Sequence, residues 1–184
     1  MTNFSMLKTS LALATTLLLA PMAQANTISK LAYGSAKDKI SADYKIDKAA
    51  CASQAGNAKD VCVEQAKAKE KIAKHELQYN YSGKQDDWTK LEVARAEAGY
   101  AVAKERCDDQ AGNARDVCRK EAKAVETKAL ADAKLSKRIV AAKVDAMDEK
   151  RDADYKVAAE KCEAMAGDAK AGCISAAKAK FGKS

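Results

Sequence analysis

The twelve residues CASQAGNAKDVC at positions 51–62 recur as CDDQAGNARDVC at 107–118 and as CEAMAGDAKAGC at 162–173. The cysteines of each copy are eleven positions apart, and the copies begin 56 and then 55 residues apart. The similarity extends outward, because Tyr44, Tyr100 and Tyr155 each lie seven residues before the first cysteine. The chain therefore contains a threefold internal repeat, and its period suits a unit of two helices and a connector.

Each copy has a glycine followed by Asn or Asp at its centre, and this pair predicts a reversal between two helices. A glycine accepts the left-handed backbone that ends many helices, and Asn or Asp is a favoured N-cap for the next helix. So short a link makes the two helices antiparallel neighbours. The predicted turn residues are Gly56 and Asn57, Gly112 and Asn113, and Gly167 and Asp168.

The cysteines of one copy are expected to stand at nearly the same height above this turn, because they lie five residues before and six after the glycine. Flanking alanines would let the helices approach to the Cα separation of about 4.4–6.8 Å that a disulfide needs. Zinc binding and a redox-active dithiol are the alternatives, but no C-x-x-C spacing is present. The predicted disulfides are Cys51–Cys62, Cys107–Cys118 and Cys162–Cys173.

Two further positions of each repeat predict packing. Seven residues are close to two helical turns, so Tyr44 shares a face with Cys51. We expect the rings of Tyr44, Tyr100 and Tyr155 inside the three hairpins, one level below the disulfides. Ile46 points to a second face, on which we expect the hairpins to pack against one another.

The repeats occupy about residues 42–77, 98–133 and 153–184, and they differ in how they are joined. Residues 78–86 contain Asn80, Ser82 and Gly83 and are predicted to form an interhelical loop, with the next helix beginning at Asp86 or Thr89. Between the second and third repeats there is neither Gly nor Pro. We therefore predict one helix over about 113–166, which repeats two and three share, and a first helix over about 35–55.

The composition agrees with an all-α, elongated array of disulfide-stapled antiparallel hairpins. Alanine occurs 41 times, and residues 26–184 hold no Pro and 30 large apolar side chains in 159 positions. So few strand-forming and core residues exclude a β-sandwich, a barrel or a doubly wound α/β domain.

The N-terminus resembles a secretory signal. Lys8 precedes an apolar run over residues 11–20, and Ala23-Gln24-Ala25 follows as a cleavage site. The run is too short to span a bilayer, which needs roughly 20 residues. We expect cleavage after Ala25 and a periplasmic chain of residues 26–184 with no membrane span, in an oxidising compartment that favours disulfides.

No constellation of residues indicates catalysis, a metal or a cofactor. His75 is the single histidine and lies beside charged residues of a predicted helix, so we interpret it as a surface residue. The carboxylates alternate with Lys and Arg at the spacing of surface ion pairs. Trp88, Tyr79 and Tyr81 form an aromatic cluster that either seats the 78–86 loop or offers a partner patch.

The charge of residues 26–184 is +6, from 32 Lys and Arg and 26 Asp and Glu. Nucleic acid is not an expected partner, because the two signs are interleaved and the chain is predicted to be exported. The excess would still attract anionic surfaces of the envelope.

The pattern Y-x-I/V-x4-C-x3-A-G-N/D-A-K/R-x2-C-x3-A-K-A, over Tyr44–Ser184, resembles uncharacterised Ala/Lys-rich exported proteins of Gram-negative bacteria. Some of these are called TolA-like or envelope-biogenesis proteins. The resemblance implies an envelope location and helical character, and it implies no catalytic residues.

The sequence therefore predicts a non-enzymatic periplasmic protein with a structural or interaction role, whose partner is an envelope protein or an anionic envelope surface. One alternative is a module that binds lipopolysaccharide or anionic lipid, and another is a redox or metal-stress protein. The sequence leaves the oligomeric state open.

Overall fold

The computed structural model describes residues 28–184, so the predicted signal peptide and its cleavage site lie outside the described residues. Within this range the chain forms five α-helices and no strand. None of these helices is both long and apolar enough to cross a membrane. The helices are α1 (Lys30–Ala50), α2 (Gly56–Ser82), α3 (Gln85–Arg106), α4 (Gly112–Cys162) and α5 (Gly167–Phe181).

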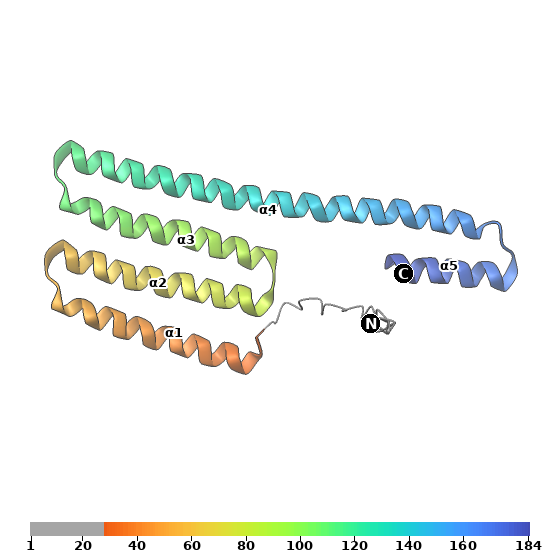
Figure 1. Ribbon diagram of the computed structural model, residues 1–184, viewed down its shortest axis with the longest axis horizontal. Helices are drawn as coiled ribbons and strands as arrows, with labels where there is room; N and C mark the ends of the chain where they lie inside the picture. The colour runs from red at the N-terminus through yellow and green to blue at the C-terminus, as the bar shows by residue number, and fades with distance from the viewer. Residues whose placement is uncertain (1–27) are drawn as a thin grey trace, which may run out of the picture.

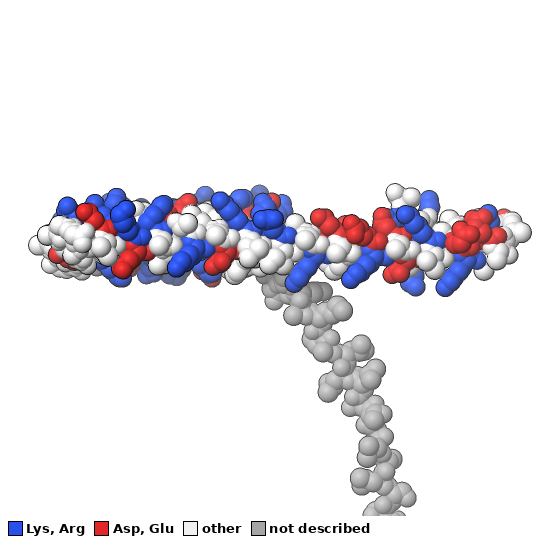
Figure 2. All heavy atoms as spheres, turned by 90° about the horizontal axis from the view of Figure 1, so that it is seen from above, with Lys and Arg blue, Asp and Glu red and all other residues white. Residues whose placement is uncertain are grey.

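The helices form one layer. α1 to α4 lie side by side, each antiparallel to the next, and α5 folds back along the far end of α4 (Figure 1). The main contacts are all between consecutive helices. Seen from the edge, the layer is about one helix thick (Figure 2). The structure confirms the predicted all-α array of three stapled hairpins.

α4 is the helix that repeats two and three share, as predicted. Its 51 residues correspond to about 76 Å at 1.5 Å per residue. It ends at Cys162, four residues before the predicted end, because residues 163–166 form the turn into α5. α3 and α5 lie on the same side of α4, one near each end (Figure 1).

A single layer has two open faces, so its core is confined to the seams between helices. Small side chains fill these seams, because they allow the helix backbones to come close. Among the described residues, the side chains less than 2% exposed are those of Leu91, Ala94 and the first cysteine of each repeat. The complete set of buried apolar residues among those described is Cys51, Ala66, Leu77, Leu91, Ala94, Ala96, Ala98, Cys107, Ala133, Cys162 and Ala177.

The three predicted disulfides are confirmed. They join the two helices of each hairpin near the turn, with Cα–Cα distances of 5.6 Å for Cys51–Cys62, 5.6 Å for Cys107–Cys118 and 5.7 Å for Cys162–Cys173. In each repeat the first cysteine is buried and the second is half-buried. The disulfides therefore lie within the seams and hold each pair of helices in register.

The glycine at the centre of each repeat has the predicted left-handed backbone, with φ of 57° at Gly56, 55° at Gly112 and 57° at Gly167. The predicted N-cap role of the next residue is wrong. No side chain caps α2, α4 or α5, and the glycine itself begins each helix. Asn113 and Asp168 therefore lie within the first turn of their helices.

Asn57 does not cap α2; its side chain forms a hydrogen bond to the second hairpin. Its Nδ2 donates a hydrogen bond of 2.9 Å to the carbonyl oxygen of Glu105, near the end of α3. The α1–α2 turn is thereby joined to the second hairpin. This contact arises only because the first two hairpins lie next to each other in the layer.

The interhelical loop predicted over residues 78–86 is much shorter in the structure. α2 continues to Ser82, and the turn consists of Gly83 and Lys84. Gly83 has a φ of 62°, and its N–H donates to the carbonyl oxygen of Tyr79, which ends the helix. Thr89 lies inside α3, where its hydroxyl donates to the carbonyl oxygen of Gln85 and does not begin the helix.

The repeat tyrosines are half-buried in all three hairpins. Tyr44 lies in a small hollow between α1 and α2, and Tyr155 packs edge-on against Phe181 of α5 with ring centroids 6.4 Å apart. Tyr100 lies between α3 and α4.

The second packing face expected from Ile46 is wrong for two repeats. Ile46 is 66% exposed, and Val157, the residue at the same position of the third repeat, is 57% exposed. The first two hairpins pack through α2 on α3. The outer side of α1 therefore forms the free edge of the layer (Figure 1).

Candidate partner-binding groove

An open groove of about 580 Å³ with an apolar floor lies between α3 and α4. Six small residues line its floor, three from each helix, and none fills the space between the helix backbones. An added Cβ at Gly99 would meet no atom within 4 Å, so this residue faces open space. The six floor residues are Ala96, Gly99, Ala103, Ala122, Ala129 and Ala133.

Helical spacing places these residues on one face of each helix. In α3 the residues at 88, 92, 96, 99 and 103 recur every three or four positions, and in α4 those at 122, 126, 129, 133 and 136 do the same. Val125 stands on the α4 rim and is 68% exposed. The groove is thus a straight channel that runs parallel to the two helices.

The charged residues that line the groove are mainly acidic. The lining residues Glu92, Arg95, Glu126 and Asp132 have a net charge of −2. Glu92 is paired with Arg95, and Glu126 with Lys123, whereas Asp132 has no ion pair among the described residues. Glu126 is 7% exposed and accepts a hydrogen bond of 2.5 Å from Lys123. The chain as a whole is basic, but this groove is not, and its charge favours a basic ligand over an anionic one.

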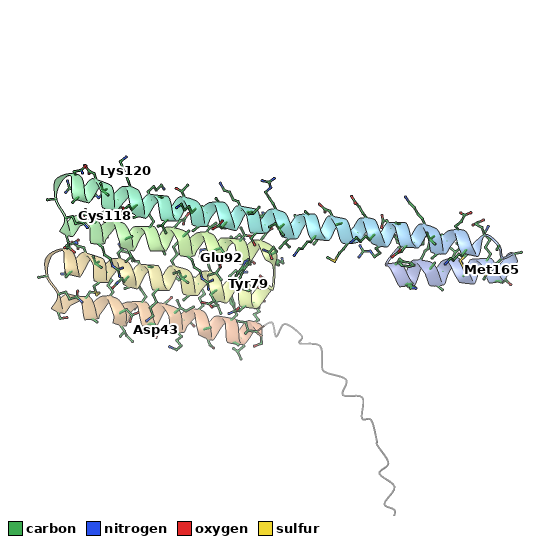
Figure 3. All side chains as sticks on the ribbon, turned by 45° about the horizontal axis from the view of Figure 1, so that its top comes forward. Asp43, Tyr79, Glu92, Cys118, Lys120 and Met165 are labelled. Carbon is green, nitrogen blue, oxygen red and sulfur yellow. A yellow bond between two sulfur atoms is a disulfide. The ribbon has the colours of Figure 1, made fainter. Side chains whose placement is uncertain are left out.

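Aromatic residues mark the two ends of the groove. Tyr100 lies toward the disulfide end, where the ammonium of Lys123 is 4.9 Å from the centre of its ring. Trp88 lies at the other end, and the guanidinium of Arg95 is 5.8 Å from its ring. In Figure 3, Glu92 and Tyr79 lie in the half of the layer near the α2–α3 turn, away from Cys118. Both ends thus offer flat apolar surface beside a charge.

The aromatic residues predicted to cluster around positions 79–88 form two separate ring pairs. Tyr79 packs on Trp88 across the turn, with ring centroids 5.1 Å apart. Tyr81 packs on Tyr33 of α1 at 4.6 Å. The two tyrosines seat the turn, whereas Trp88 also lines the groove.

A polar network fastens the α2–α3 turn, which is the one turn between antiparallel helices without a disulfide among the described residues. Asp87 is 6% exposed and accepts hydrogen bonds from Ser82 at 2.7 Å, Lys90 at 2.8 Å and Gln78 at 3.3 Å. Gln78 in turn accepts a bond of 2.9 Å from the hydroxyl of Tyr33. The network joins α1, α2 and α3 at the end opposite the first two disulfides (Figure 1).

These bonds stabilise the charged form of Asp87. The hydrogen bond from Lys90 contributes most, followed by that from Ser82, and together they lower the pKa of Asp87 to about 2. The same contact raises the pKa of Lys90. The network is therefore intact throughout the neutral range, and it holds Trp88 on the first turn of α3.

Other residues considered from the sequence do not converge on a site. His75 is half-buried on α2. Within residues 28–184 no group of three or more His, Cys, Asp or Glu side chains could hold a metal ion. The six cysteines are all paired in disulfides.

The sequence indicated Trp88 as a candidate partner-binding residue, but it did not predict the groove. Its floor consists of alanines and one glycine, and alanine recurs at helical spacing throughout the chain. A groove appears only where the neighbouring helices place two such faces side by side.

The comparisons with known proteins found no match among protein-family models, curated proteins or solved structures.

Proposed function

We propose that the protein is a non-enzymatic periplasmic scaffold that binds an envelope protein through the α3–α4 groove. The groove is the observation that supports the proposal most strongly. It is a straight channel between two packed helices, and its floor consists of small residues. Such a channel suits an amphipathic helix whose large apolar side chains fill the space that the alanines leave.

The charges around the groove narrow the class of partner. The lining has a net charge of −2, so we infer a helix with Lys or Arg beside its apolar stripe. The cations would lie against Glu92 and Asp132 on the two rims. Trp88 and Tyr100 would pack against the ends of the stripe, since aromatic residues are common anchors in interfaces.

Anionic lipid and lipopolysaccharide fit this groove less well. The overall positive charge would attract them to the protein, but the carboxylates of the groove would repel them. A redox role has weaker support, because one cysteine of every disulfide is at most 1% exposed. Periplasmic location is supported by the three disulfides, which favour an oxidising compartment.

The proposal is tested by photocrosslinking in intact cells. A photoreactive residue at Val125 should crosslink to a helical segment of an envelope protein. The same residue at Val157, which is also an exposed valine of α4, is the matched control and should not capture that segment.

A second substitution separates binding from folding. Gly99→Leu would place its side chain in the groove, because a Cβ at this position meets no atom within 4 Å. It should abolish the Val125 crosslink and leave the melting temperature the same or higher, since leucine favours helix more than glycine does. Gly172→Leu in α5 is the matched control, with equally open space around its Cβ. An unchanged crosslink in Gly99→Leu would contradict the proposal.

A further inference from the structure

α4 contains a stretch that no other described helix covers. Near the start of α3, Asp86 forms an ion pair of 3.0 Å with Lys137 of α4. Just after the end of α5, Lys183 forms an ion pair with Asp152 of α4. We call the residues between, 138–151, the α4 bridge. Figure 1 shows it as the bare part of α4 between α3 and α5.

The bridge is unusually apolar for an exposed helix. All residues from 141 to 150 are exposed. Ten large apolar side chains of the described chain are exposed, and three of them lie within the bridge. These three are Ile139, Val144 and Met147, and a fourth, Leu135, lies just before it.

Part of this apolar surface faces the gap between α3 and α5. Ala133 is buried on the side of α4 that packs on α3. Val140 follows it by seven residues, and Val144 and Met147 follow by four and three more, so all lie on nearly the same face. The seam that α3 covers at one end and α5 at the other therefore continues uncovered across the bridge.

The charges of this region change sign at its centre. Residues 134–143 carry four cations and no acid: Lys134 and Lys137 precede the bridge, and Arg138 and Lys143 lie within it. Within the bridge, residues 145–151 carry three acids and two cations, a net charge of −1, and two further acids at 152 and 154 follow directly after it. Figure 2 looks onto α4 and shows blue spheres giving way to a red group along its length. A segment with this pattern is complementary to itself when it is reversed.

We propose that the α4 bridge is a self-association site, at which a second copy of this chain crosses in the antiparallel direction about a two-fold axis near Val144. Val140, Val144 and Met147 of each copy form the apolar centre. The basic half of each bridge lies beside the acidic half of the other. A two-fold contact of this kind is closed, because the same patch serves both subunits.

The gap is wide enough for this crossing. Lys137 and Asp152 are fifteen residues apart, or about 22 Å along the helix. A helix about 10–12 Å in diameter that crosses at about 50° covers about 13–16 Å of its partner's length. α3 and α5 would thus flank the incoming helix and prevent the two α4 helices from lying parallel.

Charge-reversal variants test the proposal on the purified, oxidised protein. Arg138→Glu with Lys143→Glu changes the net charge of the bridge from +1 to −3, and Asp145→Lys with Asp148→Lys changes it to +5. These four side chains are exposed, so circular dichroism should show unchanged helix. Sedimentation velocity should show a dimer for the wild type. The dissociation constant should be at least tenfold higher for either variant alone, and an equimolar mixture should recover a heterodimer.

Three outcomes would overturn the proposal. A wild type that remains monomeric up to about 100 µM, a concentration at which even a weak self-association would be visible, would show that this face serves another purpose. A dimer that survives both reversals would place the contact elsewhere. Loss of dimer in both variants without recovery in the mixture would exclude the antiparallel charge pairing.

Discussion

Removing the third disulfide should release α5 from α4 while the rest of the layer stays folded. The change is the double substitution Cys162→Ser with Cys173→Ser, which leaves no lone thiol. α5 is the most vulnerable helix, because its main contacts with other described elements are with α4 and Ala177 is its only buried residue. A helix of 15 residues is marginal by itself in water.

The magnitude follows from the contacts that remain. The disulfide closes a loop with a sequence separation of 11, and it stabilises the hairpin by about 3 kcal/mol in the loop-entropy model. The contact between Tyr155 and Phe181 contributes about 1 kcal/mol. The exposed ion pair of Lys170 with Glu163 contributes less than about 1 kcal/mol. Lys183 forms a further ion pair with Asp152, and the disulfide is the largest single one of these contributions.

Hydrogen exchange followed by mass spectrometry measures the effect directly. A loss of about 3 kcal/mol corresponds to roughly a hundredfold faster exchange in α5, with α1 to α3 unchanged. The matched control is Cys107→Ser with Cys118→Ser. There α3 remains packed on both α2 and α4, so exchange should increase less.

Two results would refute this reasoning. If α5 kept its protection without the disulfide, its contacts with α4 would be much stronger than the buried residues indicate. If α1 to α3 lost protection together with α5, the layer would unfold as one cooperative unit and not helix by helix.

Three further predictions concern the turns. Gly112→Val should lower the free energy of unfolding by about 1–2 kcal/mol, because the backbone at this position is left-handed with a φ of 55°. Thermal melts of the oxidised protein would measure the change, and an unchanged melting temperature would contradict the left-handed turn at Gly112. Asn57→Ala should cost about 1 kcal/mol in urea titrations through the lost bond to Glu105, whereas Asn113→Ala, the equivalent change in the second repeat, should cost less. Asp87→Asn should cost about 1–2 kcal/mol at pH 7. Since the pKa of Asp87 is lowered from 3.8 to about 2, its stabilisation is present above about pH 4 and is lost as the pH falls toward 2. Urea titrations of wild type and variant should therefore converge at pH 2, and a constant difference would exclude the ionic network.

The parts of the fold that the sequence predicted are those that local chemistry determines. The disulfides and the left-handed glycines depend on the spacing of Cys and Gly within each repeat, and the absence of Gly and Pro between Cys118 and Cys162 predicts a continuous α4. The structure has all three features.

The parts that it missed depend on neighbours distant in the chain. The residues from 78 to 82 are helical because Tyr79 and Tyr81 pack on Trp88 and on Tyr33, which the turn formers nearby did not indicate. Asn57 bonds to α3 because the first two hairpins are adjacent. The groove likewise needs two alanine faces to meet.

Small-angle X-ray scattering of the monomeric, oxidised protein measures whether the helices form one open layer. We expect a maximum dimension of at least about 76 Å, the length of α4, and a thickness of about one helix diameter, roughly 10–12 Å. A maximum dimension near 50 Å with a rounded cross-section would show that α4 bends or that the layer closes into a bundle, and it would contradict both the open groove and the exposed bridge.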